Sequence, residues 1–265
     1  AGCGFDFGRP TDRKTQPMSM MALLTGLNRE SISDFVRGTE KDSSITKKRL
    51  LAEIQQAGYT PSYTRPTLFR IYDDLFLLAG NHEYGYSGIN ADDITRATIH
   101  SRTEVHRIVD ALRSLGGRWK NVRVVATNEH IGVREGRRIH GLYTVTTDDL
   151  IKGIRHEDSV CRTYFCVDVH SVQKSEGGHY TSTGVRSKPY DIPLRALIAK
   201  DVNGLLTAGR CISGDFISHS SYRVTGNSVA MGQAAGVAAA LAAQKNCLPQ
   251  EIPWERIQPA IVKLG

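Results

Sequence analysis

Runs of apolar residues along the chain predict several β-strands. Residues 22–26 form a short apolar run typical of a buried strand. Residues 67–79 read as two strands joined at Asp73-Asp74, a pattern typical of a hairpin. Four further strand-like segments lie at residues 122–126, 138–146, 164–170 and 204–209.

Other segments carry apolar residues at helical spacing. Residues 47–57 predict a helix that stops at Gly58, and residues 93–115 predict a longer one, capped by Asn90 or Asp92 and ended by two glycines. Thr147 can cap a short helix, and residues 227–244 predict a closing helix rich in small residues. Residues 194–198 suggest a short helix or an edge element.

Strands and helices mix without regular alternation until the end of the chain, where an apolar segment and the closing helix resemble one Rossmann-type unit. We therefore predict an α+β fold that becomes α/β at its C-terminal end. Residues 1–200 would form a mixed-sheet substrate-binding or cap region. Residues 201–265 would supply the last strand and helix of a Rossmann-like domain.

Composition narrows the class of protein. The 265 residues are 40% hydrophobic and 23% charged, which favours a globular core, and the net charge of +7 favours anionic partners. Basic residues are scattered, so we do not expect nucleic-acid binding. Five cysteines without regular spacing argue against a disulfide framework and a zinc site. We expect no metal, no membrane span and a cytoplasmic protein, with the periplasm as the alternative.

The segment that ends at Gly209 carries the clearest chemical signal. A glycine at the carboxyl end of a strand lets a nucleotide approach the backbone. The closing helix begins with small residues, so its free N–H groups suit an anionic or electron-rich group. Gly232, Ala235, Gly236 and Ala239 leave one helix face almost bare, which indicates close packing of a flat ligand or of backbone. Tight packing on a sheet without any ligand explains that face equally well.

Residues 205–213, Ser221, Arg223 and residues 231–236 together resemble the C-terminal flavin signature of the FAD-dependent oxidoreductase family, flavoproteins with a glutathione-reductase-like FAD domain. The order of further matching segments along the chain supports the resemblance. These segments are residues 16–19, 132–135, 137–141, 168–170 and 189–195.

The resemblance implies FAD as cofactor and roles for matching positions. Gly209 and Arg210 would lie along the FAD diphosphate or ribitol, and Ser221 and Arg223 near the isoalloxazine ring. A helix would face the flavin N1–C2=O edge and stabilise negative charge on the reduced flavin. The start of that helix would be formed by Met231, Gly232, Gln233 and Ala234.

The chain departs from the family at the dinucleotide-binding motif, which needs a strand, a G-x-G-x-x-G turn and a helix. Its nearest match is Gly2, Gly4 and Gly8, with no strand before it and Arg9-Pro10 after it, so we interpret this segment as a loop. We expect the N-terminal FAD domain to be missing from this chain. That domain would then be a partner that the chain requires to bind FAD. The chain alone would then hold FAD weakly and be inactive.

Four residues are candidates for catalysis. Asp168 and His170 alternate on a predicted strand, which suits a proton shuttle or, equally, a structural pair. Arg138 could clamp a substrate carboxylate or lie on a solvated surface. His219 is the histidine nearest the flavin signature. His179-Tyr180 lies in a loop that could be a lid or a simple turn.

The function that fits these features best is hydride transfer from a small organic, possibly anionic substrate to FAD. One rival is a carbohydrate-active protein without flavin, a polysaccharide lyase or sugar-binding module that uses Tyr180, His170 and Arg138. It leaves the bare helix face unexplained. The other rival is a non-catalytic α+β interaction domain.

Overall fold

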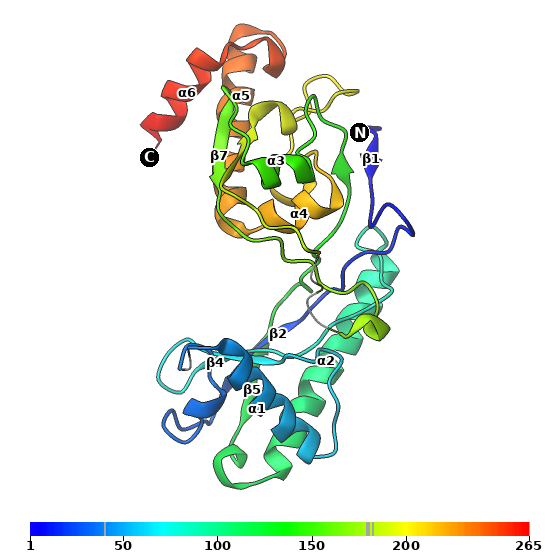
Figure 1. Cartoon of the computed structure of the whole chain (residues 1–265), viewed down its shortest axis with the longest axis vertical. Helices are drawn as coiled ribbons and strands as arrows, with labels where there is room; N and C mark the ends of the chain where they lie inside the picture. Colours follow the sequence, from blue (N-terminus) through cyan, green and yellow to red (C-terminus); the bar gives the residue numbers. More distant parts are fainter. Residues whose placement is uncertain (40, 179–180, 182, 265) are drawn as a thin grey trace. The chain divides into compact units, whose positions relative to one another are not determined.

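A computed structural model describes residues 1–39, 41–178, 181 and 183–264. The described chain divides into two compact units, each assembled from segments distant in sequence (Figure 1). Unit 1 comprises Ala1–Lys14, Glu135–Val169 and Ser182–Gly265, and unit 2 comprises Thr15–Arg134 and His170–Thr181. The predicted domain division at residue 200 follows different limits and stays a prediction. The predicted lid residues His179 and Tyr180 lie outside the described residues.

Unit 2 is built on an antiparallel sheet with strand order β3-β4-β2-β5. The strands are β2 (Met21–Thr25), β3 (Thr67–Arg70), β4 (Phe76–Ala79) and β5 (Arg123–Thr127). Leu24 pairs with Phe76 and Ala22 with Leu78, and all four side chains are buried. Their neighbours along the strands are more exposed, so one face of the sheet carries the core.

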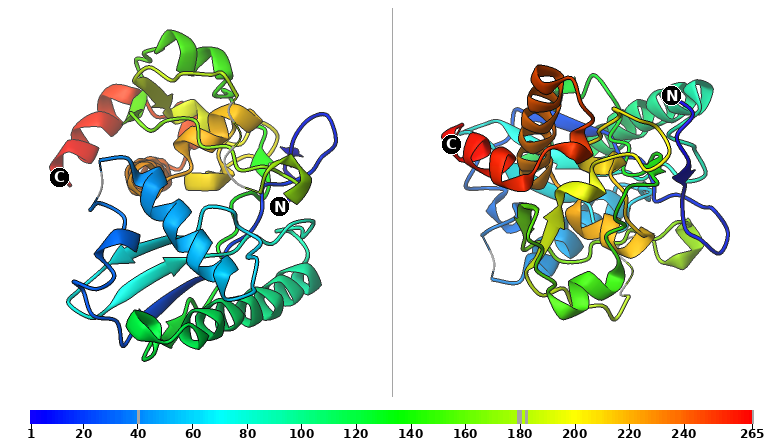
Figure 2. Two further views of the ribbon diagram at one scale, coloured as in Figure 1. Left: turned by 60° about the horizontal axis from the view of Figure 1, so that its bottom comes forward. Right: turned by 90° about the horizontal axis from the view of Figure 1, so that it is seen from above.

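Two helices supply the other half of this core, α1 (Ser43–Gln56) and α2 (Ala91–Ser114), which contact each other and the sheet (Figure 2). Their buried residues recur at helical spacing, as in Ile108 and Leu112 of α2. Asn90 caps α2 by accepting a hydrogen bond from the Asp93 amide. Three short 3₁₀ turns complete the unit: η1 (Ser33–Phe35), η2 (Gly117–Trp119) and η3 (Lys174–Glu176).

Unit 1 contains two small antiparallel pairs of strands. The first joins β1 (Phe5–Asp6) to β6 (Arg138–Ile139), and the second joins β7 (Ser159–Thr163) to β8 (Tyr190–Pro193). Between them lies α3 (Thr147–Lys152), which Thr146 caps in a capping box with Asp149. Two 3₁₀ turns follow, η4 (Leu194–Ala196) and η5 (Gly209–Cys211).

Three helices complete unit 1. They are α4 (Phe216–Tyr222), the long α5 (Thr225–Lys245) and α6 (Trp254–Lys263), with a 3₁₀ turn, η6 (Pro249–Glu251), before the last of them. Asp215 caps α4 by accepting a hydrogen bond from the Ser218 amide. Helix α5 packs against α6, β7 and η5, which makes it the central helix of the unit (Figure 1).

The structure confirms the α+β class and most of the predicted elements. The hairpin, both long helices, the short helix after Thr146 and the strand near residue 124 all form close to their predicted limits. Phe5 and Asp6 pair with Ile139 and Arg138, so the glycine-rich start contains a short strand where a loop was predicted. Every ladder between named strands of the described residues is antiparallel, where a mixed sheet was expected.

Three predicted strands are wrong. The segment 204–209 forms a single bridge between Leu206 and Ile198 and then the η5 turn, so no Rossmann-like strand precedes α5 in the described chain. Of residues 138–146 only Arg138–Ile139 is a strand. The segment 164–170 follows β7 without regular structure, because a strand needs a hydrogen-bonded neighbour and this segment has no ladder.

The lack of a strand at residues 164–170 affects two residues that were predicted to act as a pair, Asp168 and His170. Asp168 belongs to unit 1 and His170 to unit 2. The alternation of side chains on one strand, from which their pairing was predicted, does not apply to them. In a separate finding, no helix in the described parts of the chain is long and apolar enough to cross a membrane.

Candidate functional site

The N-terminus of α5 is open. Its N-cap residue, Val224, makes no side-chain hydrogen bond to the first turn. Thr225 and Gly226 are exposed, and a Cβ atom placed on Gly226 would meet nothing within 4 Å. The first N–H groups of this 21-residue helix are therefore accessible, and the helix dipole makes their surroundings electropositive.

One face of α5 has small side chains and points away from the rest of unit 1. A Cβ atom added at Gly232 or Gly236 would again meet nothing within 4 Å, and Val229 is 66% exposed. The opposite face packs into the unit through Met231, Ala234, Ala238 and Ala242. The predicted bare face is thus present, and nothing among the described residues packs closely on its glycines.

The resemblance placed the start of this helix at Met231–Ala234, and that position is wrong. The helix begins two turns earlier, at Thr225. Met231 and Ala234 are fully buried, Gln233 is half-buried and Gly232 is exposed. The free N–H groups belong instead to Thr225, Gly226 and Asn227, which follow the resemblance residue Arg223 directly.

Gly209 lies next to this helix. Its φ angle is +70°, a conformation that favours glycine, and an added Cβ would lie 3.0 Å from the Ser228 hydroxyl. Any larger residue would strain the η5 turn and push against α5. Arg210, the next residue, is exposed, and its carbonyl accepts a hydrogen bond from His219. The predicted pair Gly209 and Arg210 therefore lies against the first turns of α5.

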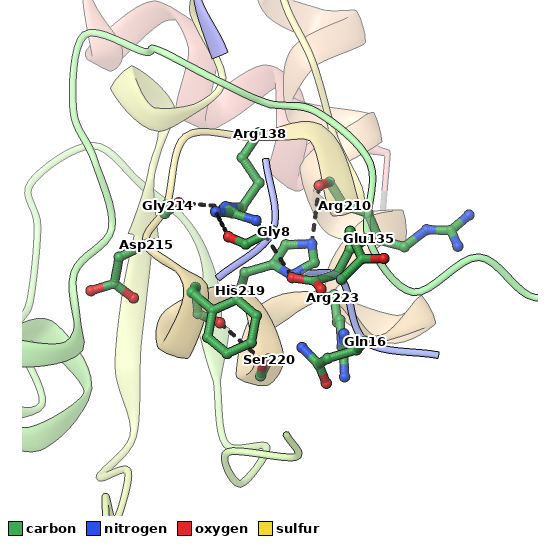
Figure 3. Close-up of polar contacts among 12 residues, drawn as sticks. Gly8, Gln16, Glu135, Arg138, Arg210, Gly214, Asp215, His219, Ser220 and Arg223 are labelled. Carbon is green, nitrogen blue, oxygen red and sulfur yellow. Dashed lines mark hydrogen bonds and ion pairs between the residues drawn. The ribbon is translucent and has the colours of Figure 1, made fainter. Parts of the chain in front are cut away.

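Arg138 and His219 lie together inside unit 1 (Figure 3). The Arg138 guanidinium is 2% exposed and donates to the carbonyls of Gly214 (3.1 Å) and Gly8 (3.0 Å). It also forms an ion pair with Glu135 at 3.5 Å. Arg138 therefore ties three segments together rather than presenting a free clamp to solvent. The alternative of a solvated surface does not hold for Arg138, because backbone carbonyls and a carboxylate satisfy its charge inside the unit.

His219 is also completely buried. Its Nε2 lies 3.2 Å from the Arg210 carbonyl, and its Nδ1 lies 3.8 Å from the Glu135 carboxylate. Burial, with the nearby charges of Arg223 and Arg138, lowers the pKa of His219 well below its usual range. The imidazole is neutral at physiological pH, so it donates Nε2–H to the Arg210 carbonyl and holds the η5 turn in place.

Ser221, Arg223 and Asp168 form a second set of contacts. The buried Ser221 hydroxyl donates to the Phe165 carbonyl at 2.7 Å. Arg223 donates from Nη2 to the Asp168 carbonyl, also at 2.7 Å. Asp168 in turn donates its amide to the Ser220 carbonyl. The irregular segment around Asp168 is thereby fixed to α4, and Arg223 is held just before the open start of α5.

In unit 2, His170 lies in a group of aromatic rings. Its ring centroid is 4.9 Å from that of His82 and 6.3 Å from that of Tyr63. His82 contacts the Tyr84 hydroxyl through Nδ1 at 3.0 Å. The His170 amide donates to the Gln16 side chain at 2.7 Å. We refer to Tyr63, His82, Tyr84 and His170 as the ring cluster.

Sequence reasoning missed several of these residues. Glu135 stood in a matching segment without a role, and His82 was not among the candidates. Their importance comes from partners more than 80 positions away, which periodicity cannot reveal. One local signal was available for His82, since His82, Glu83 and Tyr84 lie in the loop after β4, separated from the end of the strand by two residues, and loop residues often serve a site.

The described residues fit one part of FAD. The free first turn of α5, with Arg223 before it and Arg210 nearby, suits an electron-rich ring edge or a phosphate. No strand, glycine turn and helix for the adenosine half is found in the described chain. The described residues also hold no group of three or more His, Cys, Asp or Glu side chains able to bind a metal.

Comparison with known proteins agrees with this fit. The family model described as FAD dependent oxidoreductase matches residues 1–261, and the chain therefore belongs to this family. The family uses FAD, so the protein has an oxidoreductase role, as the resemblance predicted. No curated protein and no solved structure matches the chain. The match favours the flavin interpretation over the two rivals considered from the sequence.

Proposed function

We propose that this protein oxidises a small organic substrate by hydride transfer to FAD, with the open start of α5 facing the pyrimidine edge of the flavin. The observation that carries the proposal is the uncapped and exposed first turn of α5, preceded by Arg223. When bound, FAD supplies the hydride-accepting ring. The N–H groups of Thr225, Gly226 and Asn227 stabilise negative charge at that edge.

The buried network in unit 1 positions these groups. Arg138 and Glu135 hold the interior on which His219 rests, and His219 holds the Arg210 carbonyl. The Asp168 carbonyl fixes Arg223. In this proposal Arg138, His219 and Asp168 are positioning residues, whereas Arg210 and Arg223 contact the cofactor. Ser221 contributes by anchoring α4 to the Phe165 carbonyl, and Gly209 by admitting Ser228 closely.

His170 is the group we propose to accept the substrate proton. When a C–H hydride leaves a carbon that bears an O–H or N–H group, the proton of that group must also leave. A neutral histidine imidazole beside the reacting group can accept that proton as a general base. His82 and Tyr63 restrict the orientation of the His170 ring through the contacts of the ring cluster.

The bare face of α5 is the surface we propose for the dinucleotide-binding part of the flavin site. Gly232 and Gly236 allow backbone to approach the helix closely, and no described residue does so. A chain without this part is expected to bind FAD weakly. Titration with FAD tests that expectation, and tight stoichiometric binding by the chain alone would contradict it.

The flavin-edge proposal can be tested at Val224. Val224→Asp adds a helix cap together with a negative charge at the proposed pyrimidine edge, and Val224→Asn adds the cap without the charge. Both should stabilise the helix by roughly 1 kcal/mol. We expect Val224→Asp to weaken FAD binding about tenfold more than Val224→Asn, as measured by flavin difference absorption. Equal FAD affinity in wild type and both variants would place the flavin elsewhere.

The proton-acceptor proposal needs a separate experiment. In His170→Gln, a substrate that reduces the flavin of the wild-type protein should do so at least about 100-fold more slowly, because general-base catalysis contributes roughly 10²–10⁴-fold. FAD affinity should stay the same. A control, His130→Gln, changes an imidazole that is 89% exposed and should alter neither quantity. Unchanged flavin reduction in His170→Gln would contradict the role of His170.

A further inference from the structure

A cavity of about 600 Å³ opens on unit 2 beside β3 and the turn after η1. None of the candidate residues described above lines it. Its volume falls within the range of roughly 300–1,000 Å³ that is typical of sites for small organic molecules. The residues that matter for its chemistry are Arg29, Arg37, Arg70, Val36, Phe69 and Phe76.

The wall of the cavity is built at the edge of the unit 2 sheet, where β3 is the outermost strand. After η1 the chain runs beside this strand. Val36 bridges Leu68 in parallel, and the Arg37 amide donates to the Leu68 carbonyl at 2.8 Å. Leu68 points into the core, so Phe69 points to the opposite face, where it is half-buried in the cavity wall.

The charge around the cavity is positive and uncompensated. Three arginines and one carboxylate, Glu30, line it and leave an excess of two positive charges. Arg29, Arg37 and Arg70 are all exposed, and none forms an ion pair with a described residue. Exposed guanidinium groups without carboxylate partners attract an anion.

A cavity of similar size in unit 1, about 630 Å³, shows the contrast. Its arginines already have partners. Arg155 lies 2.7 Å from the Asp191 carboxylate, and Arg195 lies 3.0 Å from the Asp158 carboxylate. The arginines of that cavity are therefore neutralised by the protein itself, whereas those of the unit 2 cavity are left for a ligand.

The cavity also offers an apolar wall. The Arg37 guanidinium lies over the Phe69 ring, 5.4 Å from its centroid, so cation–π attraction holds the charge next to an aromatic surface. Val36 and Phe76 also line the cavity, but their side chains belong to the buried core of unit 2. An apolar wall beside unpaired guanidinium groups suits a molecule that has a flat carbon body and an acidic group at one end.

We propose that this cavity is a binding site for an organic anion with a flat apolar body, such as an aromatic carboxylate. The acidic group binds Arg37 and Arg70, and the ring lies on Phe69. The site is independent of the flavin proposal, because it shares no residue with it.

The binding test uses 2-naphthoate as the probe and the uncharged 2-naphthamide as its matched control, with isothermal titration of the whole chain. We expect saturable 1:1 binding of 2-naphthoate and at least about tenfold weaker binding of 2-naphthamide, because a charge-assisted hydrogen bond contributes about that factor. Raising the salt concentration should weaken naphthoate binding and leave naphthamide binding nearly unchanged.

Variants locate the site. Arg37→Gln and Arg70→Gln should each weaken naphthoate binding about tenfold, whereas Arg123→Gln, which changes an exposed arginine on β5, should not. Phe69→Ala should weaken both probes. Thermal melting checks that each variant is folded. Equal binding of the two probes, no effect of either arginine variant, or no saturable naphthoate binding would each overturn the proposal.

Discussion

The interiors of the two units differ in what dominates them, although both bury charged groups: in unit 2, Glu83 is 2% exposed and Glu104 is 4% exposed. Unit 2 encloses one continuous cluster of buried apolar side chains contributed by its sheet and by α1 and α2. Unit 1 buries charged and polar groups among its apolar residues, including Arg138, Glu135, His219 and Asp191. Apolar packing stabilises a core whatever its partners, whereas a buried charge stabilises only while its partner is present.

The two long helices repeat this difference. Helix α2 has a side-chain cap at Asn90 and acidic residues in its first turn, and it packs a continuous apolar face on the sheet. Helix α5 has no side-chain cap and no acidic residue in its first turn, and its small-residue face is open. Helix α2 therefore completes its own unit, while α5 leaves groups available for a ligand.

Breaking the buried ion pair of unit 1 should have the largest effect. Arg138→Leu removes the partner of the fully buried Glu135 and should lower the free energy of unfolding by about 3–5 kcal/mol, measured by urea denaturation. The neighbouring Arg137 is exposed, so Arg137→Leu should change the free energy of unfolding by less than about 0.5 kcal/mol. A loss below about 1 kcal/mol in Arg138→Leu would show that the pair with Arg138 contributes little to stability.

The apolar core of unit 2 should respond differently. Ile108→Ala leaves a cavity at a fully buried position and should cost about 3 kcal/mol in the same measurement. The loss should be equal at pH 5 and pH 8, because no titratable group is removed. A loss that changes with pH would mean that the core of unit 2 is coupled to ionisable groups, and the contrast between the units would fail.

The buried histidine makes unit 1 sensitive to acid. The folded protein keeps His219 neutral because burial lowers its pKa, whereas the unfolded chain binds a proton there below about pH 6.5. Above that pH, the contribution of the neutral His219 to the free energy of unfolding is fully present. As the pH decreases further, the free energy of unfolding falls by up to about 1.4 kcal/mol per pH unit until the lowered pKa is reached. His219→Gln should remove this slope, measured by melting between pH 5 and pH 8. His130→Gln should keep it.

The helix caps give the smallest expected effect. Asn90→Ala removes the hydrogen bond to the Asp93 amide and should lower the free energy of unfolding by roughly 1 kcal/mol. Val224→Asn should raise it by a similar amount, since α5 has no side-chain cap to lose. If α2 has a side-chain cap and α5 has none, the free energy of unfolding must fall in Asn90→Ala and rise in Val224→Asn.

The sequence predicted the elements that depend on local spacing. Helix α2 follows from its apolar stripe, its cap at Asn90 and the glycines that end it, and the hairpin of β3 and β4 follows from two apolar runs around a turn. Such elements bury a face set by their own periodicity. The flavin signature and the bare face of α5 are likewise written in consecutive residues, which is why family membership was predictable.

Segments that depend on distant partners were not predictable in the same way. Residues 204–209 have a strand-like composition, but their backbone hydrogen bonds to Leu197 and Ala199 close a single bridge at Leu206, so no ladder forms. The pairing of β7 with β8 was missed because these strands are separated by more than 20 residues and neither shows strong alternation. Strand formation requires a neighbour, and the neighbour is chosen by the whole fold.

The placement of charge was decided by tertiary structure alone. Nothing next to Arg138 in the sequence indicates burial, yet the carbonyls of Gly8 and Gly214, 130 and 76 positions away, surround its guanidinium. Asp168 and His170 are two positions apart but belong to different units. Periodicity and motif by themselves determined the helices, the family and the cofactor. Which charged groups are buried, and which are left for a ligand, depends on contacts that only the folded chain brings together.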